Sequence, residues 1–336
     1  MKQKIQIRCK NNKKSQKVEI GSTLFDVFSS FDLKMTHGPV SARVNNKVEG
    51  MHYRVYNSKD VEFLDMNSAS GSRAYTRTLF FVLCKAVQDI YPNTDVVIDI
   101  PVSNGFYVDI RLGRPVVEED VNILRRRMQE IIDAKMPIRR YMVPTEDAIA
   151  LFQEKGDVEK VKLLKTSGSI YTTYYKIGEY VDFYYGTLLT NTSGLYLFGL
   201  EKYYDGMLLR IPSLKDPDKL GEMTKQDKMF DIFKEHHRWQ DILGIRTVGD
   251  FNQAIDAGHA TDIINIGSRR GGLAAGLLLP VQIQERHPAA GYAPACQHRP
   301  QHGAVDAAAA ADVGRRFPRL TRVHTRHPCA LRVEQG

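Results

Sequence analysis

Short runs of alternating apolar and polar residues mark the beginning of the chain, and such alternation is typical of half-buried β-strands. They occupy Lys4–Cys9, Val18–Ile20, Ser41–Val44 and Asp60–Phe63. Between the second and third runs, Gly21-Ser22-Thr23 offers a helix N-cap before apolar residues at helical spacing, namely Leu24, Val27 and Phe28. The order strand, strand, helix, strand, strand predicts a small α+β domain over residues 1–66.

The stretch 67–224 mixes helical and strand periodicities. Apolar residues recur at helical spacing over Arg77–Tyr91 and again over Val121–Ile132, the second run following three acidic residues that suit a helix N-terminus. A shorter helix is expected at Glu146–Lys155. Strands are expected at Val96–Ile100, Tyr107–Ile110, Tyr171–Tyr175 and Leu195–Leu200, the first two joined by a Pro101–Gly105 turn. We therefore predict a second α+β domain over residues 67–224.

The end of the chain differs from the rest in composition. Residues 225–266 carry helical patterns and are expected to form a helical connector. Residues 267–336 contain no Lys, ten Arg and four acidic residues, so they supply most of the net charge of +8. Large apolar residues are too few there to hold a core, and we expect low order. A natural basic tail and translation in a shifted reading frame are both open, and the abrupt change favours the shifted frame.

Composition also bears on the compartment. Hydrophobic residues make up 43% and charged residues 26% of the chain, which is ordinary for globular proteins. The sequence has no uncharged apolar run of about 18 residues, and its basic N-terminus lacks the apolar core of a secretory signal. The four cysteines form no CxxC pair, which argues against a disulfide framework and a cysteine-rich zinc site. We expect a cytoplasmic protein without a membrane partner.

Two motifs resemble parts of threonyl-tRNA synthetases. Asn104-Gly105-Phe106-Tyr107-Val108-Asp109 resembles the NGFYYDF signature of the editing region, and Ala42–Val55 resembles a stretch of the preceding TGS domain, a ubiquitin-like β-grasp module. The resemblance implies a TGS-like β-grasp domain over residues 1–66 and an editing-like domain over 67–224. In the editing enzymes, two His in an HxxxH helix, a Cys and a third His support hydrolysis of wrongly attached amino acids.

The resemblance can be followed to the positions of those four residues. Counting back from Tyr91-Pro92, the HxxxH positions carry Arg77 and Phe81; after the intact Glu179-Tyr180-Val181-Asp182, the Cys and His positions carry Tyr184 and Leu188. Phenyl and isobutyl groups cannot ligate a metal or activate water, and Arg77 would repel a cation. We therefore expect no metal, no catalytic residue and no deacylation of the editing type.

The same pattern of lost ligands resembles the N-terminal part of uridine kinase-like proteins, in which a TGS domain and a degenerate editing-like domain precede a P-loop kinase domain. That domain needs GxxxxGK[ST] to hold phosphates, and Gly267-Ser268-Arg269-Arg270-Gly271-Gly272 lacks the Lys. We interpret the chain as the non-catalytic N-terminal part of a nucleoside kinase-like protein. It would need no cofactor itself, since ATP and Mg belong to the missing kinase domain. The alternative is an editing-type hydrolase or RNA-binding module related to threonyl-tRNA synthetase.

Two groups of residues are candidates for binding RNA or a nucleotide. Arg77, Asp182 and Tyr184 would line the vestigial cleft, where Arg77 either pairs with Asp182, the favoured arrangement, or grips a phosphate. A basic run near the N-terminus suits RNA phosphates, and it comprises Lys10, Lys13, Lys14 and Lys17. Six tyrosines either stack unpaired bases or pack within strands; they are Tyr171, Tyr174, Tyr175, Tyr180, Tyr184 and Tyr185.

Overall fold

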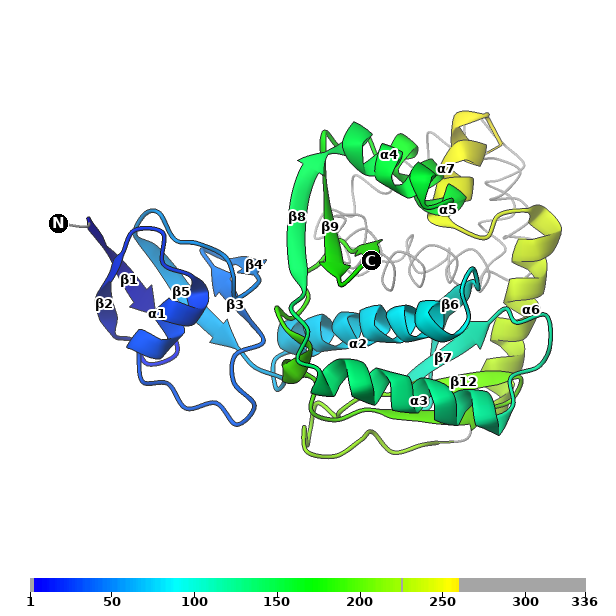
Figure 1. The fold of residues 1–336 in the computed structure, drawn as a ribbon, viewed down its shortest axis with the longest axis horizontal. Helices are drawn as coiled ribbons and strands as arrows, with labels where there is room; N and C mark the ends of the chain where they lie inside the picture. Colours follow the sequence, from blue (N-terminus) through cyan, green and yellow to red (C-terminus); the bar gives the residue numbers. More distant parts are fainter. Residues whose placement is uncertain (1–2, 225, 260–336) are drawn as a thin grey trace, which may run out of the picture. The chain divides into compact units, whose positions relative to one another are not determined.

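The computed structural model describes residues 3–224 and 226–259 (Figure 1). The chain divides into two compact units. Among the described residues, the first contains the chain up to Tyr141 and Thr173–Asp227, and the second contains Met142–Thr172 together with residues 228–259. The predicted tail 267–336 lies outside the described residues, and the predicted domain boundaries remain predictions. Among the described residues, no helix is both long and apolar enough to cross a membrane.

The first unit begins with a five-stranded mixed sheet and one helix. The elements are β1 (Lys4–Cys9), β2 (Ser15–Glu19), α1 (Leu24–Ser30), β3 (Ser41–Val44), β4 (Lys47–Glu49) and β5 (Lys59–Leu64). The strand order is β2-β1-β5-β3-β4, in which β1 and β5 are parallel and the other neighbours antiparallel. Thr23 caps α1 as expected, since its side chain accepts a hydrogen bond from the Asp26 amide. Leu24, Val27 and Phe31 pack with the inward residues of the sheet.

One strand of this sheet was missed by the sequence pattern. Asn45 and Asn46 both have positive φ, 45° and 72°, which is the conformation of a type I′ hairpin turn. The turn brings β4 back along β3, with Val44 opposite Lys47. A strand of three residues is too short to show a periodicity of two, so the sequence pattern did not predict it.

A four-stranded antiparallel sheet follows, in the order β11-β12-β7-β6. Its strands are β6 (Val96–Val102), β7 (Gly105–Ile110), β11 (Gly199–Tyr203) and β12 (Gly206–Arg210). The expected Pro101–Gly105 turn is shorter than predicted, because only Ser103 and Asn104, with φ of 56° and 55°, leave the strands. Gly105 must lack a side chain, since an added Cβ would lie 2.6 Å from the Leu209 carbonyl oxygen of the neighbouring strand.

The expected strand Leu195–Leu200 is also wrong in its first half, because β11 begins only at Gly199. Before it, the Tyr75 hydroxyl accepts hydrogen bonds from the amides of Tyr196 (3.0 Å) and Leu197 (2.9 Å) and donates to the Leu197 carbonyl (2.8 Å). A buried side chain therefore satisfies backbone groups that a neighbouring strand would otherwise have satisfied.

Helices α2 (Ala69–Ile90) and α3 (Glu118–Asp133) lie side by side along this sheet (Figure 1). Helix α2 starts at Ala69, eight residues before the predicted Arg77, and the side chain of its N-cap Ser68 accepts a hydrogen bond from the Gly71 amide. Its first turns are rich in Ser and Gly, so the apolar pattern did not reveal them. From Leu79 to Leu83 every side chain is buried, which makes α2 the central helix of the largest core cluster.

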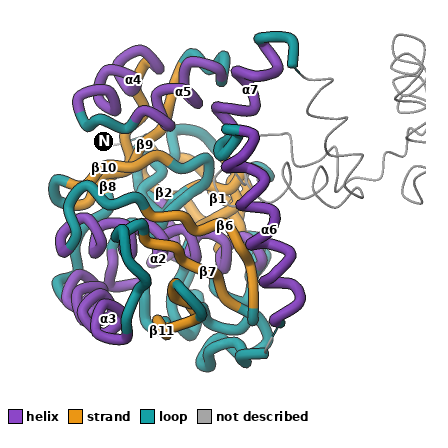
Figure 2. Tube along the Cα trace, turned by 90° about the vertical axis from the view of Figure 1, so that its right-hand side faces the viewer, coloured by secondary structure: helices purple, strands orange, loops and turns teal. Residues whose placement is uncertain are grey.

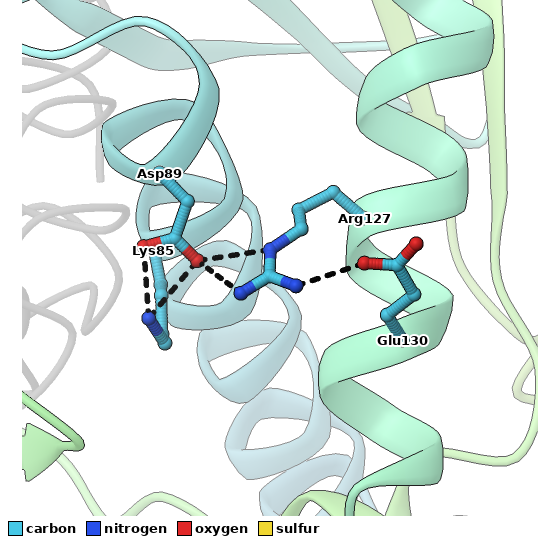
Figure 3. A network of polar contacts seen from close by, with 4 residues as sticks. All are labelled: Lys85, Asp89, Arg127 and Glu130. Carbon is cyan, nitrogen blue, oxygen red and sulfur yellow. Dashed lines mark hydrogen bonds and ion pairs between the residues drawn. The ribbon is translucent and has the colours of Figure 1, made fainter.

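Ion pairs tie α2 to α3 at their partly exposed sides, as Figure 3 shows. The Asp89 carboxylate accepts hydrogen bonds from Lys85 Nζ (3.0 Å to each oxygen) and from Arg127 Nε (3.0 Å) and Nη2 (2.8 Å). Arg127 Nη1 also donates to Glu130 (2.8 Å). A shared carboxylate therefore links the two helices at this place.

A second carboxylate organises the start of α3. Asp120 is buried, and it accepts from both terminal nitrogens of Arg114 (2.7 and 2.8 Å), from the Tyr91 hydroxyl (2.7 Å) and from the Val117 amide (2.9 Å). These bonds, with Arg114 first, hold the pKa of Asp120 well below its usual value. The predicted acidic turn thus does more than complement the helix dipole, because one of its carboxylates joins α3 to the end of α2.

A three-stranded sheet, in the order β10-β9-β8, spans the residues where the two units join in the sequence. Its strands are β8 (Arg139–Pro144), β9 (Tyr171–Ile177) and β10 (Tyr180–Phe183). Strand β9 was predicted from residue 171, and it extends two residues beyond the predicted end.

The second unit is helical, and its helices are α4 (Thr145–Glu154), α5 (Val158–Thr166), α6 (Asp227–Leu243) and α7 (Val248–Asp256). The first residue of α6, Asp227, still belongs to the first unit. Figure 2 shows α4, α5 and α7 close together. Lys162 of α5 pairs with Asp250 of α7 at 3.0 Å, and Gly249 lies against the backbone of Leu163. Helix α5 was not predicted, whereas α4 and the helical character after residue 225 were.

Candidate functional site

Helix α2 and the segment after β10 bring together the four positions that the sequence resemblance matched to the ligands of the editing enzymes, a match that stays a prediction. Arg77 and Phe81 lie one turn apart on α2, and Tyr184 and Leu188 follow β10. All four are buried, at 8%, 0%, 8% and 2% exposure respectively. The Phe81 ring meets the Tyr184 ring edge-on, with 5.9 Å between their centroids. The segment is fixed to α2 because the Leu189 amide donates to Thr78 Oγ1 at 2.9 Å.

The side chains gathered here pack against one another. Phe81 and Leu188 belong to the main core cluster together with Tyr184. Within the described part of the chain, no group of three or more His, Cys, Asp or Glu is placed to hold a metal ion. The arrangement therefore presents one cation, Arg77, among apolar and phenolic groups.

Arg77 is unusual because its charge has no counter-ion among the described residues. Its Nη1 donates to the Thr187 carbonyl at 3.3 Å, and its Nε has no hydrogen-bond partner. Burial, with a smaller contribution from the nearby Arg73, lowers the pKa of Arg77 to about 10. The hydroxyl of Thr187 is likewise buried without a partner, so two neighbouring residues carry unsatisfied polar atoms.

Gly186 is required by the position of this guanidinium. A Cβ at residue 186 would lie 2.3 Å from both Cζ and Nη1 of Arg77 and 2.8 Å from Nη2. Such similar distances mean that the guanidinium turns its flat face toward Gly186. The Gly186 carbonyl in turn accepts from the Tyr175 hydroxyl at 2.8 Å, which holds the segment in place.

Asp182 does not form the ion pair with Arg77 that the sequence favoured. One of its carboxylate oxygens accepts from the Phe183 amide (2.7 Å) and the other from the Tyr180 hydroxyl (3.2 Å). Burial and then the Asp182 charge raise the pKa of Tyr180 well above its usual value, so this tyrosine stays a donor. The Asp182 carboxylate is thus hydrogen-bonded by the Phe183 amide and the Tyr180 hydroxyl, whereas the sequence had suggested Arg77 as its partner.

The predicted RNA-contact lysines lie on the hairpin of β1 and β2. Lys10, Lys13, Lys14 and Lys17 are all exposed, the first three in or beside the turn and the last on β2. Strand pairing adds two cations that the sequence analysis missed, because Lys4 and Arg8 lie opposite Glu19 and Ser15 on the same outer face as Lys17. The alternation of period two along Lys4–Cys9 was the signal for them. We call these six residues the basic hairpin.

The tyrosines separate into two groups. Tyr175 and Tyr184 are buried in the core cluster, which is a packing role. Tyr174 instead stacks on Tyr141 of β8, with ring centroids 5.1 Å apart and planes 17° from parallel. Tyr141 was not among the six predicted, since it lies thirty residues before them in the sequence and is placed by the pairing of β8 with β9.

Comparisons with known proteins point in one direction, although no protein-family model matches the chain. Threonine–tRNA ligase of Syntrophotalea carbinolica is 30% identical over 226 residues, covering 63% of this chain and 35% of that protein. The ligase of Acetivibrio thermocellus is 28% identical over 245 residues, covering 64% and 38%. That of Clostridium kluyveri is 26% identical over 257 residues, covering 69% and 40%.

These relatives support the predicted resemblance to threonyl-tRNA synthetases, and they offer no support for the nucleoside kinase. The chain spans 35–40% of the length of the three relatives. The chain therefore carries a threonyl-tRNA synthetase-like region.

Proposed function

We propose that residues 1–224 form an RNA-binding module of the threonyl-tRNA synthetase type that has no editing activity. A TGS-type β-grasp domain would occupy residues 1–66, and its strand order β2-β1-β5-β3-β4 with one helix suits that assignment. An editing-like domain would occupy residues 67–224. The observation that carries the loss of activity is the buried set Arg77, Phe81, Tyr184 and Leu188 at the four catalytic positions. The module would act without a metal or cofactor.

The basic hairpin is the proposed RNA contact. Its six cations are exposed, and none forms an ion pair with another described residue. Exposed lysines and arginines can neutralise RNA phosphates. Each neutralised phosphate makes the slope of log K against log salt concentration more negative by about 0.7–0.9. The hairpin thus offers charge without base recognition, so we expect binding that depends on backbone and shape more than on sequence.

A binding titration tests the RNA contact. Fluorescence anisotropy of a labelled threonine tRNA with the full chain, at several salt concentrations, should show binding that weakens as salt rises. The double variant Lys13→Ala, Lys14→Ala should bind several-fold more weakly and with a salt slope smaller by about 1–2. Lys34→Ala, which removes an exposed lysine from the loop after α1, is the matched control and should bind as the wild type does. Equal affinity for all three proteins would reject the hairpin as the contact.

A deacylation assay tests the loss of activity. The full chain, incubated with correctly and incorrectly charged aminoacyl-tRNA, should release amino acid no faster than buffer does. Hydrolysis that depends on the protein and is lost in Tyr184→Phe or Arg77→Ala would show that the region is a working hydrolase.

A further inference from the structure

We propose that Arg77 anchors a binding site for a small oxyanion, a carboxylate or phosphate group, at the place where the editing enzymes carry their catalytic residues. The proposal concerns a small ligand and stands whether or not the basic hairpin binds RNA. It rests on three features of Arg77, which are its burial, its unused donors and its orientation.

Burial makes the charge of Arg77 costly. The side chain is only 8% exposed, and arginine stays protonated at physiological pH. Buried charges in proteins are nearly always paired, because an unpaired charge loses its hydration without compensation. Among the described residues no carboxylate pairs with Arg77, and the carboxylate that the sequence offered, Asp182, is bonded to Phe183 and Tyr180. An incoming anion would supply the missing partner.

The unused donors lie on one edge of the guanidinium. Nη1 is engaged by the Thr187 carbonyl, whereas Nε and Nη2 bond no described residue. Nε and Nη2 point in parallel and match the two oxygens of a carboxylate or phosphate, which is the bidentate geometry that arginine forms with oxyanions. The buried hydroxyl of Thr187 also lacks a partner and lies on the residue that Nη1 contacts.

Orientation and surroundings define the ligand. The guanidinium turns its face to Gly186, so a ligand meets its edge and cannot stack on that face. Phe81 and Leu188 nearby are apolar, and Arg73 adds positive potential. Such surroundings disfavour cations and accommodate one anionic group, either a free ion or the end of a larger molecule.

Thermal unfolding of the full chain provides the first test. Sodium phosphate and sodium acetate are titrated separately at constant ionic strength against sodium chloride, because a ligand of the folded state raises the Tm with concentration. We expect at least one anion to raise the Tm of the wild type, with its apparent Kd weakened at least tenfold in Arg77→Met. Arg126→Gln, which removes an exposed guanidinium from α3, should retain the response. A response to phosphate alone or to acetate alone assigns the class, and a response to both leaves the general oxyanion site.

The Nε–H resonance of Arg77 provides a second test that does not depend on the stability of a variant. In ¹H–¹⁵N spectra of the wild type, this signal, assigned by its loss in Arg77→Lys, should shift with the anion that raises the Tm. The proposal is wrong if neither anion raises the Tm or moves the resonance, or if Arg77→Met responds as the wild type does. Neither experiment contains RNA, so that result would leave the RNA-binding proposal untouched.

Discussion

Gly186→Ala tests whether the Arg77 guanidinium is fixed where the structure places it. The added Cβ would lie 2.3 Å from Cζ and Nη1 of Arg77. Favourable contacts between such atoms begin near ~3.5 Å, so the guanidinium would have to move by about 1 Å. Because the Arg77 side chain is buried, there is little room for that movement. Overpacking of this kind costs about 1–3 kcal/mol of unfolding free energy.

The measurement is a double-mutant cycle by urea denaturation, followed by far-ultraviolet circular dichroism. The four proteins are the wild type, Gly186→Ala, Arg77→Met and the double variant. Methionine is unbranched and flexible, so the alanine should cost less than ~0.5 kcal/mol in the Arg77→Met background. The coupling energy of the cycle is therefore expected to be about 1 kcal/mol or more. Gly50→Ala is the control, since its added Cβ would meet nothing closer than 3.9 Å.

Two results would refute this reasoning. If Gly186→Ala costs no more than Gly50→Ala, the guanidinium moves aside freely and is not held by its surroundings. If the alanine costs the same in the wild type and in the Arg77→Met background, the strain arises from the backbone at residue 186 and has nothing to do with Arg77.

Individual contacts support three further predictions. Arg77→Met alone should raise the unfolding free energy by about 1–3 kcal/mol in a buffer without oxyanions, because it removes an uncompensated buried charge; a loss of stability in urea denaturation would indicate an unseen partner. Asp120→Asn should cost ~2 kcal/mol at pH 7. The pKa of Asp120 is lower in the folded state than in the unfolded state, so the stability that its charge contributes is complete above the unfolded-state pKa and is lost as the pH falls through the folded-state pKa. The difference in unfolding free energy between the wild type and Asp120→Asn should therefore narrow below about pH 4. A constant difference would contradict this. Tyr75→Phe should cost about 2–3 kcal/mol, because it leaves the amides of Tyr196 and Leu197 unpaired; an unchanged Tm would show that water replaces the hydroxyl.

Much of the fold could be predicted from local pattern, and the errors have local causes. Strand β1 and helix α3 were visible because a single face of each is buried, which imposes periods of two and 3.6. The start of α2 was hidden, since Ser and Gly residues near Ser68 carry no apolar pattern and only the cap reveals the helix. The false start of β11 arose because Leu195–Phe198 are apolar enough for a strand, whereas the Tyr75 hydroxyl holds their backbone from a distant helix.

The structure brings Arg77, Phe81 and Tyr184 near one another, whereas their contacts differ from those that the sequence suggested. Resemblance located Arg77 and Tyr184, and helical spacing put Phe81 one turn from Arg77. The predicted pairing of Arg77 with Asp182 was wrong, because the Asp182 carboxylate instead accepts a hydrogen bond from the amide of the adjacent residue, Phe183. Similarly, the stacking of Tyr141 on Tyr174 depends on strand pairing across thirty residues, which no local pattern records.

The path of the chain through β8 and β9 has a consequence for how this protein can vary. The chain leaves the first unit within β8, after Tyr141, and returns to it within β9, at Thr173, and these two strands are neighbours in one sheet. The exit and the return are therefore as close as the two ends of a hairpin. Residues 145–170, which contain α4 and α5, therefore interrupt the first unit between two neighbouring strands without separating those strands. Changes to this segment are limited by α7, because Lys162 of α5 pairs with Asp250 and Gly249 lies against the Leu163 backbone.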